Sequence, residues 1–301
     1  SASSASQHLL QRPASAVAVG PRLGSLTAPG ASGLARAATA PFVAAVVAGA
    51  RAGVSAADRR RSVAEAGKMV MELPRLWLRP HSEPMADPLA WHGAEHVDAA
   101  LARGRGLMVL TAHLGSFEVA AQAYAERWGA QQPMTALYRP ARQPWLRQVM
   151  EQSRHRPGLL TAPASLAGVR QLMRALKAGQ TLGMLPDQVP PEGLGVWAPF
   201  YGEPAYTMTL AAKLAAQTGC ALLLITVQRR PQGGGYDVHV APLPEPLPPL
   251  ERGGPEAEAA WTLAAATALN RAMQWQIDRL PSQYLWGYHR FKQPRQAEAV
   301  A

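Results

Sequence analysis

The sequence predicts an α/β fold in which a mixed, mostly parallel central sheet carries helices on both faces. Three observations lead to this class. Short apolar runs alternate with segments of helical periodicity, most of the helical segments end at a glycine, and a long amphipathic segment closes the chain. The 301 residues, of which 48% are hydrophobic, suffice to bury a sizeable core.

The first helix is expected over 62–73, where apolar residues recur at helical spacing, and Pro74 should end or kink it. A Pro- and His-rich linker, 79–88, precedes the alternating part. There, periodicity and terminal glycines predict helices over 94–102, 116–128, 144–153, 166–178, 207–217 and 256–280. The apolar runs predict strands over 106–112, 134–138, 181–185, 222–228 and 236–241. A turn of three glycines separates the last two strands, and a Pro-rich connector, 242–255, precedes the long C-terminal helix.

Composition favours an acidic partner in a reducing compartment. The net charge is +10, and +6 of it falls on residues 1–61, with seven Arg against one acid. With 6% aromatic residues and no basic-aromatic interleaving, nucleic acid is not expected as the partner. The single cysteine, Cys220, excludes disulfides and Cys-based zinc sites, and the histidines lack the HExxH spacing, so no metal is expected.

We therefore expect three regions: an Ala/Ser/Arg-rich leader over 1–61, weakly ordered or membrane-associated, a catalytic domain over 62–292, and a tail over 293–301. The best apolar stretch in the leader, 37–50, has 14 residues and contains Pro41, which is too short to span a bilayer. Its basic flanks are typical of reversible attachment to an anionic membrane surface.

A histidine and a glutamate five residues apart form the most informative motif. His113 follows the apolar strand, Gly115 gives the chain freedom to turn, and Glu118 falls on the first turn of the next helix. On one continuous helix the two side chains would point about 140° apart, so they can meet only if His113 is on the turn. A carboxylate can then orient an imidazole as general base for a hydroxyl group. The alternative is that Glu118 merely favours the helix N-terminus and His113 is a strand-end residue.

Two further polar clusters also follow predicted strands, where ligands bind in open α/β sheets. Tyr138-Arg139-Pro140 is followed by more arginines, including Arg154, and arginine suits bidentate phosphate recognition. Either arginine could equally be a solvated surface residue. Asp187, in Pro186-Asp187-Gln188, could equally be an ordinary turn residue.

The order of these motifs resembles the lipid A biosynthesis acyltransferases, the late lauroyl/myristoyl transferases of Gram-negative bacteria within the wider glycerolipid acyltransferase superfamily. The resemblance spans roughly residues 63–292. Its motifs are Thr111-Ala112-His113-x-Gly115-x-x-Glu118, Tyr138-Arg139-Pro140, Arg154-x-Arg156-x-Gly158, Pro186-Asp187-Gln188, Pro199-Phe200-Tyr201-Gly202 and Pro281-Ser282-Gln283-Tyr284-Leu285-Trp286 with His289-Arg290-Phe291-Lys292. Ser116-Phe117 departs from the Asn-Trp that the family usually has.

The resemblance implies an O-acyltransferase of lipopolysaccharide synthesis at the cytoplasmic face of the bacterial inner membrane. His113 would take the proton of an acceptor hydroxyl, and Glu118 would hold the imidazole. Arg139 and Arg154 would bind phosphate, and Asp187 would orient an arginine or the acceptor. The donor would be the thioester of an acidic acyl carrier protein or of CoA, with no other cofactor.

Backbone N–H groups near Gly115 are further candidates to hold an anion or a developing oxyanion. Other readings remain open at this level. The same chemistry could act on a lysophospholipid, an aminolipid or a glycolipid, because the His/Glu pair sees only a hydroxyl. A non-catalytic lipid-binding homologue would be expected to have lost His113 or Glu118, and both are present.

Overall fold

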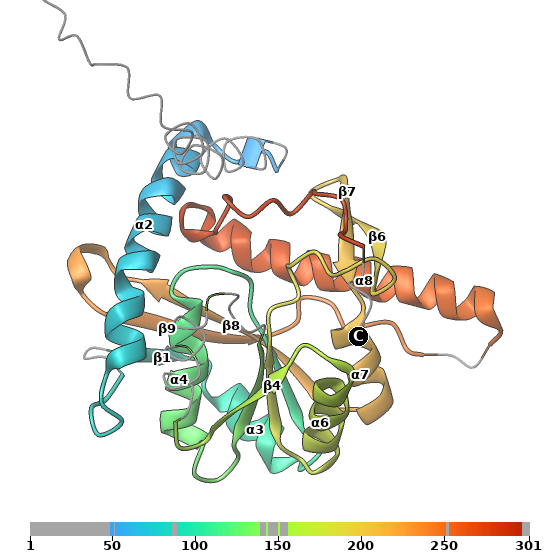
Figure 1. The fold of residues 1–301 in the computed structure, drawn as a ribbon, viewed down its shortest axis with the longest axis horizontal. Helices are drawn as coiled ribbons and strands as arrows, with labels where there is room; N and C mark the ends of the chain where they lie inside the picture. The colour runs from blue at the N-terminus through green and yellow to red at the C-terminus, as the bar shows by residue number, and fades with distance from the viewer. Residues whose placement is uncertain are drawn as a thin grey trace, which may run out of the picture. The chain divides into compact units, whose positions relative to one another are not determined.

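In the computed structural model of the chain, the described residues are 49–50, 52–85, 89–138, 143, 150, 156–250 and 253–296 (Figure 1). The main sheet has seven strands in the order β1-β9-β8-β2-β5-β3-β4. Neighbouring strands are parallel throughout, except that β8 and β9 are antiparallel. The strands are β1 (Leu89–His92), β2 (Leu107–Leu110), β3 (Met134–Tyr138), β4 (Leu159–Pro163), β5 (Thr181–Met184), β8 (Ala221–Arg229) and β9 (Tyr236–Pro242).

Helices cover both faces of this sheet, which confirms the predicted fold class. The helices are α2 (Ala56–Leu78), α3 (Glu95–Ala102), α4 (Phe117–Trp128), α6 (Leu166–Lys177), α7 (Leu210–Thr218) and the long C-terminal α8 (Pro255–Arg279). Side chains of α6, α7 and α8 form one buried core cluster, and side chains of α2, α3 and α4 contribute to another. The central strand β2 supplies alternate residues to the two clusters, Met108 and Leu110 to the first and Leu107 and Val109 to the second.

After α8 the chain continues through a short 3-10 helix, η2 (Pro281–Gln283). A two-stranded antiparallel hairpin, β6 (Gly195–Phe200) and β7 (Glu203–Met208), lies outside the main sheet, and a second 3-10 turn, η1 (Pro231–Gly233), joins β8 to β9. Within the described residues, no helix combines the length and the apolarity that crossing a membrane requires.

The structure corrects the sequence-based expectations in three places. The first helix, α2, runs from Ala56 through Pro74 to Leu78. Pro74 is exposed and so is Val70, whose carbonyl loses its helical donor, so water can replace the missing hydrogen bond. The strands β1 and β4 and the β6–β7 hairpin were not predicted, and α7 begins at Leu210 rather than at 207 because residues 207 and 208 end β7. The expected helix over 144–153 lies, apart from Met150, outside the described residues.

Candidate active site

His113 and Asp187 meet because their strands are neighbours. β2 pairs in parallel with β5, with Leu110 opposite Met184, so the two carboxyl ends lie side by side. His113 follows the end of β2 by three residues, and Asp187 follows the end of β5 by three residues. The topology therefore places both side chains at the edge of the sheet where open α/β folds bind ligands.

Asp187 holds His113 by two hydrogen bonds. The imidazole Nδ1 lies 2.7 Å from Oδ1 of Asp187, and the backbone N–H of His113 donates to Oδ2 over 2.9 Å. The Tyr284 hydroxyl also donates to Oδ2, over 3.3 Å. Asp187 is only 1% exposed, so its carboxylate contacts protein groups rather than solvent. An ionised carboxylate can only accept, and Nδ1 therefore carries the proton and Nε2 is the basic nitrogen.

The Nε2 atom points away from Asp187. The side-chain amide nitrogen of Gln188 lies 3.0 Å from it and donates into its lone pair. The ring of Phe117 meets the imidazole edge-on at a centroid distance of 4.8 Å, and Tyr288 lies nearly parallel to it at 6.2 Å. Gln188 is exposed. An incoming hydroxyl group could therefore take the place of the amide at Nε2.

The electrostatics of the pair favour a charged imidazole. Burial lowers the pKa of His113, but the negative charge of Asp187 and its hydrogen bond, with a smaller effect from Glu118, outweigh burial and raise this pKa above its ordinary 6.5. Burial raises the pKa of Asp187, while the charge and hydrogen bonds of His113 and the charge of Arg290 outweigh it, so that pKa is lowered. Asp187 thus remains ionised and stabilises the imidazolium that forms when His113 accepts a proton.

The sequence analysis expected Glu118 to hold the imidazole; the structure places Asp187 at Nδ1, and the holding role of Glu118 stays a prediction. Glu118 lies on the first turn of α4 and acts on His113 through its charge. The sequence analysis expected Asp187 to orient an arginine or the acceptor. It could not predict the contact with His113, because the order of strands in the sheet, which makes β2 and β5 neighbours, cannot be read from the sequence. The usable signal was that His113 and Asp187 both follow buried strands by a few residues.

Gly115 makes the turn between β2 and α4. Its φ is +59°, and a Cβ atom added there would lie 1.9 Å from the carbonyl oxygen of Val227, so only glycine fits. The N–H groups of Gly115 and Ser116 donate to the carbonyl oxygens of Gln283 and Val227, both over 2.9 Å. These two N–H groups therefore hold the turn in place, and contact of Gly115 with a substrate stays a prediction.

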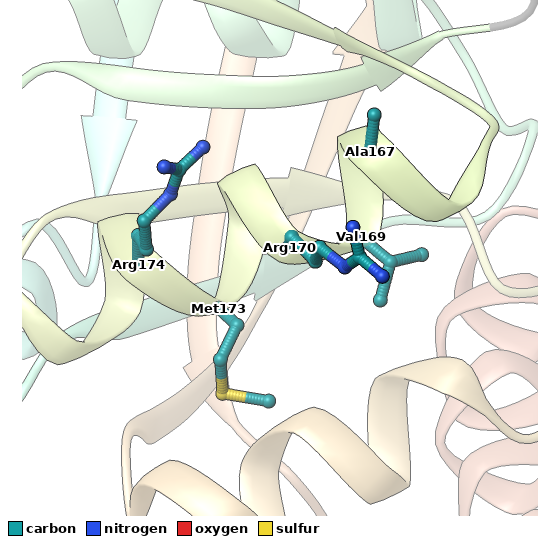
Figure 2. A pocket seen from close by; sticks show the side chains of 5 residues that line it. All are labelled: Ala167, Val169, Arg170, Met173 and Arg174. Atoms are coloured by element: carbon teal, nitrogen blue, oxygen red, sulfur yellow. The ribbon is translucent and has the colours of Figure 1, made fainter.

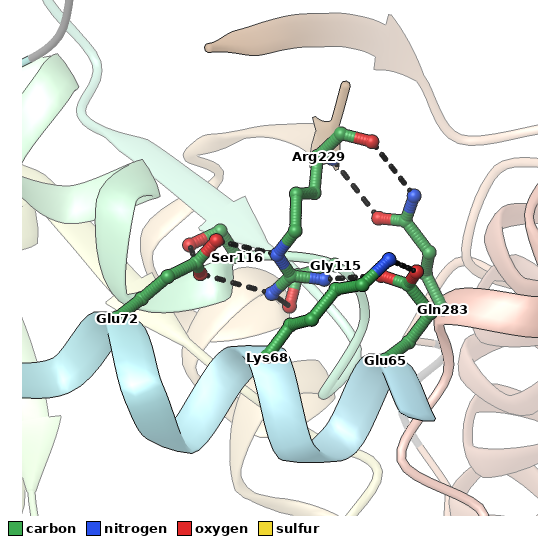
Figure 3. Close-up of polar contacts among 7 residues, drawn as sticks. All are labelled: Glu65, Lys68, Glu72, Gly115, Ser116, Arg229 and Gln283. Atoms are coloured by element: carbon green, nitrogen blue, oxygen red, sulfur yellow. Dashed lines mark hydrogen bonds and ion pairs between the residues drawn. The ribbon is translucent and has the colours of Figure 1, made fainter. Parts of the chain in front are cut away.

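A second polar cluster braces the same turn, and the sequence analysis did not identify it (Figure 3). Arg229, at the end of β8, donates to the carbonyl of Gly115 over 3.3 Å and forms ion pairs with Glu65 and Glu72 of α2. Ser116 donates its hydroxyl proton to Glu72 over 2.9 Å. The turn that carries His113 is thereby tied to α2.

The segment after α8 closes the other side of the site. The backbone N–H of Leu285 donates to the carbonyl of His113 over 2.9 Å. Five residues later Arg290 is fully buried, and it donates to the carbonyl of Tyr206 and to the side chains of Thr207 and Asn270. This arginine anchors the C-terminal segment, and its charge helps to keep Asp187 ionised.

The structure does not test the two arginines predicted to bind phosphate. Arg139 and Arg154 fall outside the described residues, so their phosphate contacts stay predictions. Arg156, of the same motif as Arg154, is buried and donates to the carbonyls of Leu76 and Arg79. Within the described ranges, no group of three His, Cys, Asp or Glu side chains could hold a metal ion.

A depression lies along α6 (Figure 2). It is lined by Ala167, Val169, Arg170, Met173 and Arg174. None of these residues is among those that contact His113.

Comparison with known proteins points to one family. The sequence model of the bacterial lipid A biosynthesis acyltransferases matches residues 54–293. The chain is similar to the lipid A biosynthesis palmitoleoyltransferase of Escherichia coli K12, with 29% identity over 246 residues, which are 79% of this chain and 74% of the relative. It is similar to the same extent to the lipid A biosynthesis acyltransferase of Shigella flexneri. The lipid A biosynthesis lauroyltransferase of E. coli K12 is also 29% identical, over 247 residues.

Proposed function

Because the chain belongs to the bacterial lipid A biosynthesis acyltransferase family, we propose that it moves a fatty acyl chain from a carrier thioester to a hydroxyl group of a lipid A precursor, with His113 as general base. The observation that carries this proposal is the hydrogen bond between His113 Nδ1 and the buried carboxylate of Asp187, which leaves Nε2 as the basic atom at the open side of the site.

His113 alone can carry the one proton that the reaction moves from the acceptor hydroxyl to the leaving thiolate. The acceptor hydroxyl displaces the Gln188 amide and gives its proton to Nε2, while its oxygen attacks the thioester carbonyl carbon. The new C–O bond forms, the tetrahedral intermediate collapses, and the C–S bond breaks. The leaving thiolate takes the proton from the imidazolium, which yields an ester and a free thiol and restores neutral His113. No acyl-enzyme intermediate is needed.

Two carboxylates support this step in different ways. Asp187 fixes the ring and the tautomer of His113 and faces the imidazolium at hydrogen-bond distance. Glu118 adds a second negative charge from the first turn of α4, as its effect on the pKa of His113 indicates. We assign Arg139 and Arg154 to phosphate groups of the acceptor or the donor, and an acidic acyl carrier protein or CoA as the donor. We also propose the cytoplasmic face of the inner membrane as the place of the reaction.

The proposal is tested by acyl transfer with purified protein, followed by mass spectrometry of the acceptor. The wild-type protein should add one acyl chain to a lipid A precursor, and His113→Ala should slow this by about 10² to 10⁴ fold. The matched control is His96→Ala, an exposed histidine on α3. Offering a lysophospholipid, an aminolipid and a glycolipid in parallel separates the acceptor classes. A wild-type protein that binds these lipids and acylates none would favour the non-catalytic homologue.

A further inference from the structure

The outward side of α2 exposes large apolar side chains. Met71 is 79% exposed, Leu78 71% and Val70 56%. A soluble surface carries scattered apolar residues, but here they follow the helix repeat. We define the outer face of α2 as the exposed stripe that recurs every three or four residues, namely Arg60, Ala64, Gly67, Met71, Pro74 and Leu78, with Val70 beside it. The neighbouring row, seven residues apart, consists of Arg61, Lys68 and Arg75, all exposed.

The acidic side chains of α2 follow the row of cations around the helix and are engaged within the protein, and Glu65 also pairs with Lys68 over 2.5 Å. Glu65 and Glu72 pair with the buried Arg229, and Glu72 also accepts from Ser116 (Figure 3). Asp58 accepts from Ser55 at the helix N-cap. The carboxylates therefore fasten the helix to the site, while the outer face is apolar apart from Arg60 and is bordered by the exposed cations Arg61 and Arg75.

We propose that the outer face of α2 docks on the surface of an anionic lipid bilayer. Apolar side chains on such a helix enter the boundary between headgroups and acyl chains, and cations beside them meet the anionic headgroups. A nucleic acid would satisfy the cations but would leave Met71 and Leu78 without an apolar partner. A lipid surface supplies both kinds of partner at once.

This docking would also fix the position of the active site relative to the bilayer. Glu72 and Arg229 connect α2 to Ser116 and to the Gly115 carbonyl, which are three and two residues after His113. A bilayer held by the outer face of α2 therefore lies on the far side of the helix that braces the catalytic turn. The inference rests on the proposed function in one respect: an enzyme that acylates a lipid must reach the membrane that holds this lipid.

Co-sedimentation with vesicles tests the proposal on the full chain. The docking variant is Arg61→Gln/Met71→Gln/Arg75→Gln. The matched control is Leu166→Gln/Arg170→Gln/Arg174→Gln on α6, which also removes two cations and one apolar side chain, Leu166 being 78% exposed. Each cation near an anionic leaflet changes partitioning about fivefold, and loss of Met71 brings the expected total to about 100-fold. Circular dichroism and the melting temperature verify that both variants fold.

The proposal predicts that wild type and the control bind phosphatidylglycerol vesicles, with weaker binding at high salt, and that the docking variant does not. Docking is refuted if wild type binds no vesicles, if the docking variant binds like wild type, or if the control loses as much binding. A separate measurement places a fluorescent probe at Met71→Cys in a Cys220→Ala background, because Cys220 is the chain's single cysteine. Its emission should shift to the blue with anionic vesicles, and a probe at Leu166→Cys should not shift. If the proposed function is wrong instead, wild type shows no acyl transfer while these binding results stand.

Discussion

Replacing Asp187 by Asn tests the partnership with His113 with little change in shape. The substitution removes the negative charge that faces the imidazolium and offers an amide where Nδ1 needs an acceptor. With charge centres about 4 Å apart and an effective dielectric constant of about 20, the lost attraction is about 4 kcal/mol. Because each 1.36 kcal/mol is about tenfold in rate, turnover should fall by about 10³ fold.

The pH profile gives this prediction a second, independent readout. His113 works as a base when it is neutral, so the rate rises with pH through its pKa, and in the wild type this rise should be centred above 6.5. In Asp187→Asn the raising effects of Asp187 are gone and burial, the largest effect, still lowers the pKa. The acidic limb should therefore move to lower pH, toward or below 6.5.

The assay is the initial rate of acyl transfer between pH 5 and pH 9, with the fold checked by circular dichroism at each pH. Asp237→Asn is the control, since Asp237 also pairs with a histidine, His92, over 3.1 Å but on strands β9 and β1. It should leave both rate and profile unchanged. Near-normal turnover of Asp187→Asn with an unmoved acidic limb would refute the assignment.

Three other predictions concern the surroundings of His113. Glu118→Gln should lower the pKa of His113 and shift the acidic limb in the same direction as Asp187→Asn but less, because Glu118 is the smallest of the raising effects; a limb that moves upward would contradict this. Gly115→Ala should destabilise the protein by more than 1 kcal/mol, measured by urea unfolding, because its φ is positive and the added Cβ meets the Val227 carbonyl; Gly202→Ala, which has a positive φ but no neighbour within 4 Å, is the control for steric contact. Gln188→Ala should lower the Michaelis constant for the acceptor or leave it unchanged, since the acceptor hydroxyl must displace this amide from Nε2, and a large rise in that constant would show that Gln188 binds the acceptor instead.

The sequence predicted the helices and strands well where the spacing of apolar residues agrees with a glycine or proline at the end of the segment. Gly129 and Gly219 follow α4 and α7 directly, and β3 was predicted with its exact bounds because an apolar run begins after Pro133. The two edge strands, β1 and β4, were missed because each is short and mixes polar or proline residues with apolar ones. Edge strands need less burial than central ones, so their hydrophobic signal is weaker.

The candidate site was predicted in its residues more than in its contacts. His113, Glu118 and Asp187 were all singled out, and the structure brings His113 and Asp187 into direct contact. That contact depends on β2 and β5 being neighbours although 70 residues separate them in the chain. The brace formed by Arg229 with Glu65 and Glu72 was missed for the same reason, because its members lie about 160 residues apart.

The most direct test of the account compares folded His113→Ala with wild type in a single measurement, the rate at which a lipid A precursor gains the mass of one acyl chain from an acyl-carrier-protein thioester. The account predicts one added acyl chain per acceptor with the wild-type protein and a loss of about 10² to 10⁴ fold with His113→Ala. A His113→Ala protein that acylates the precursor at a near-normal rate would contradict the central claim that Nε2 of His113 takes the hydroxyl proton.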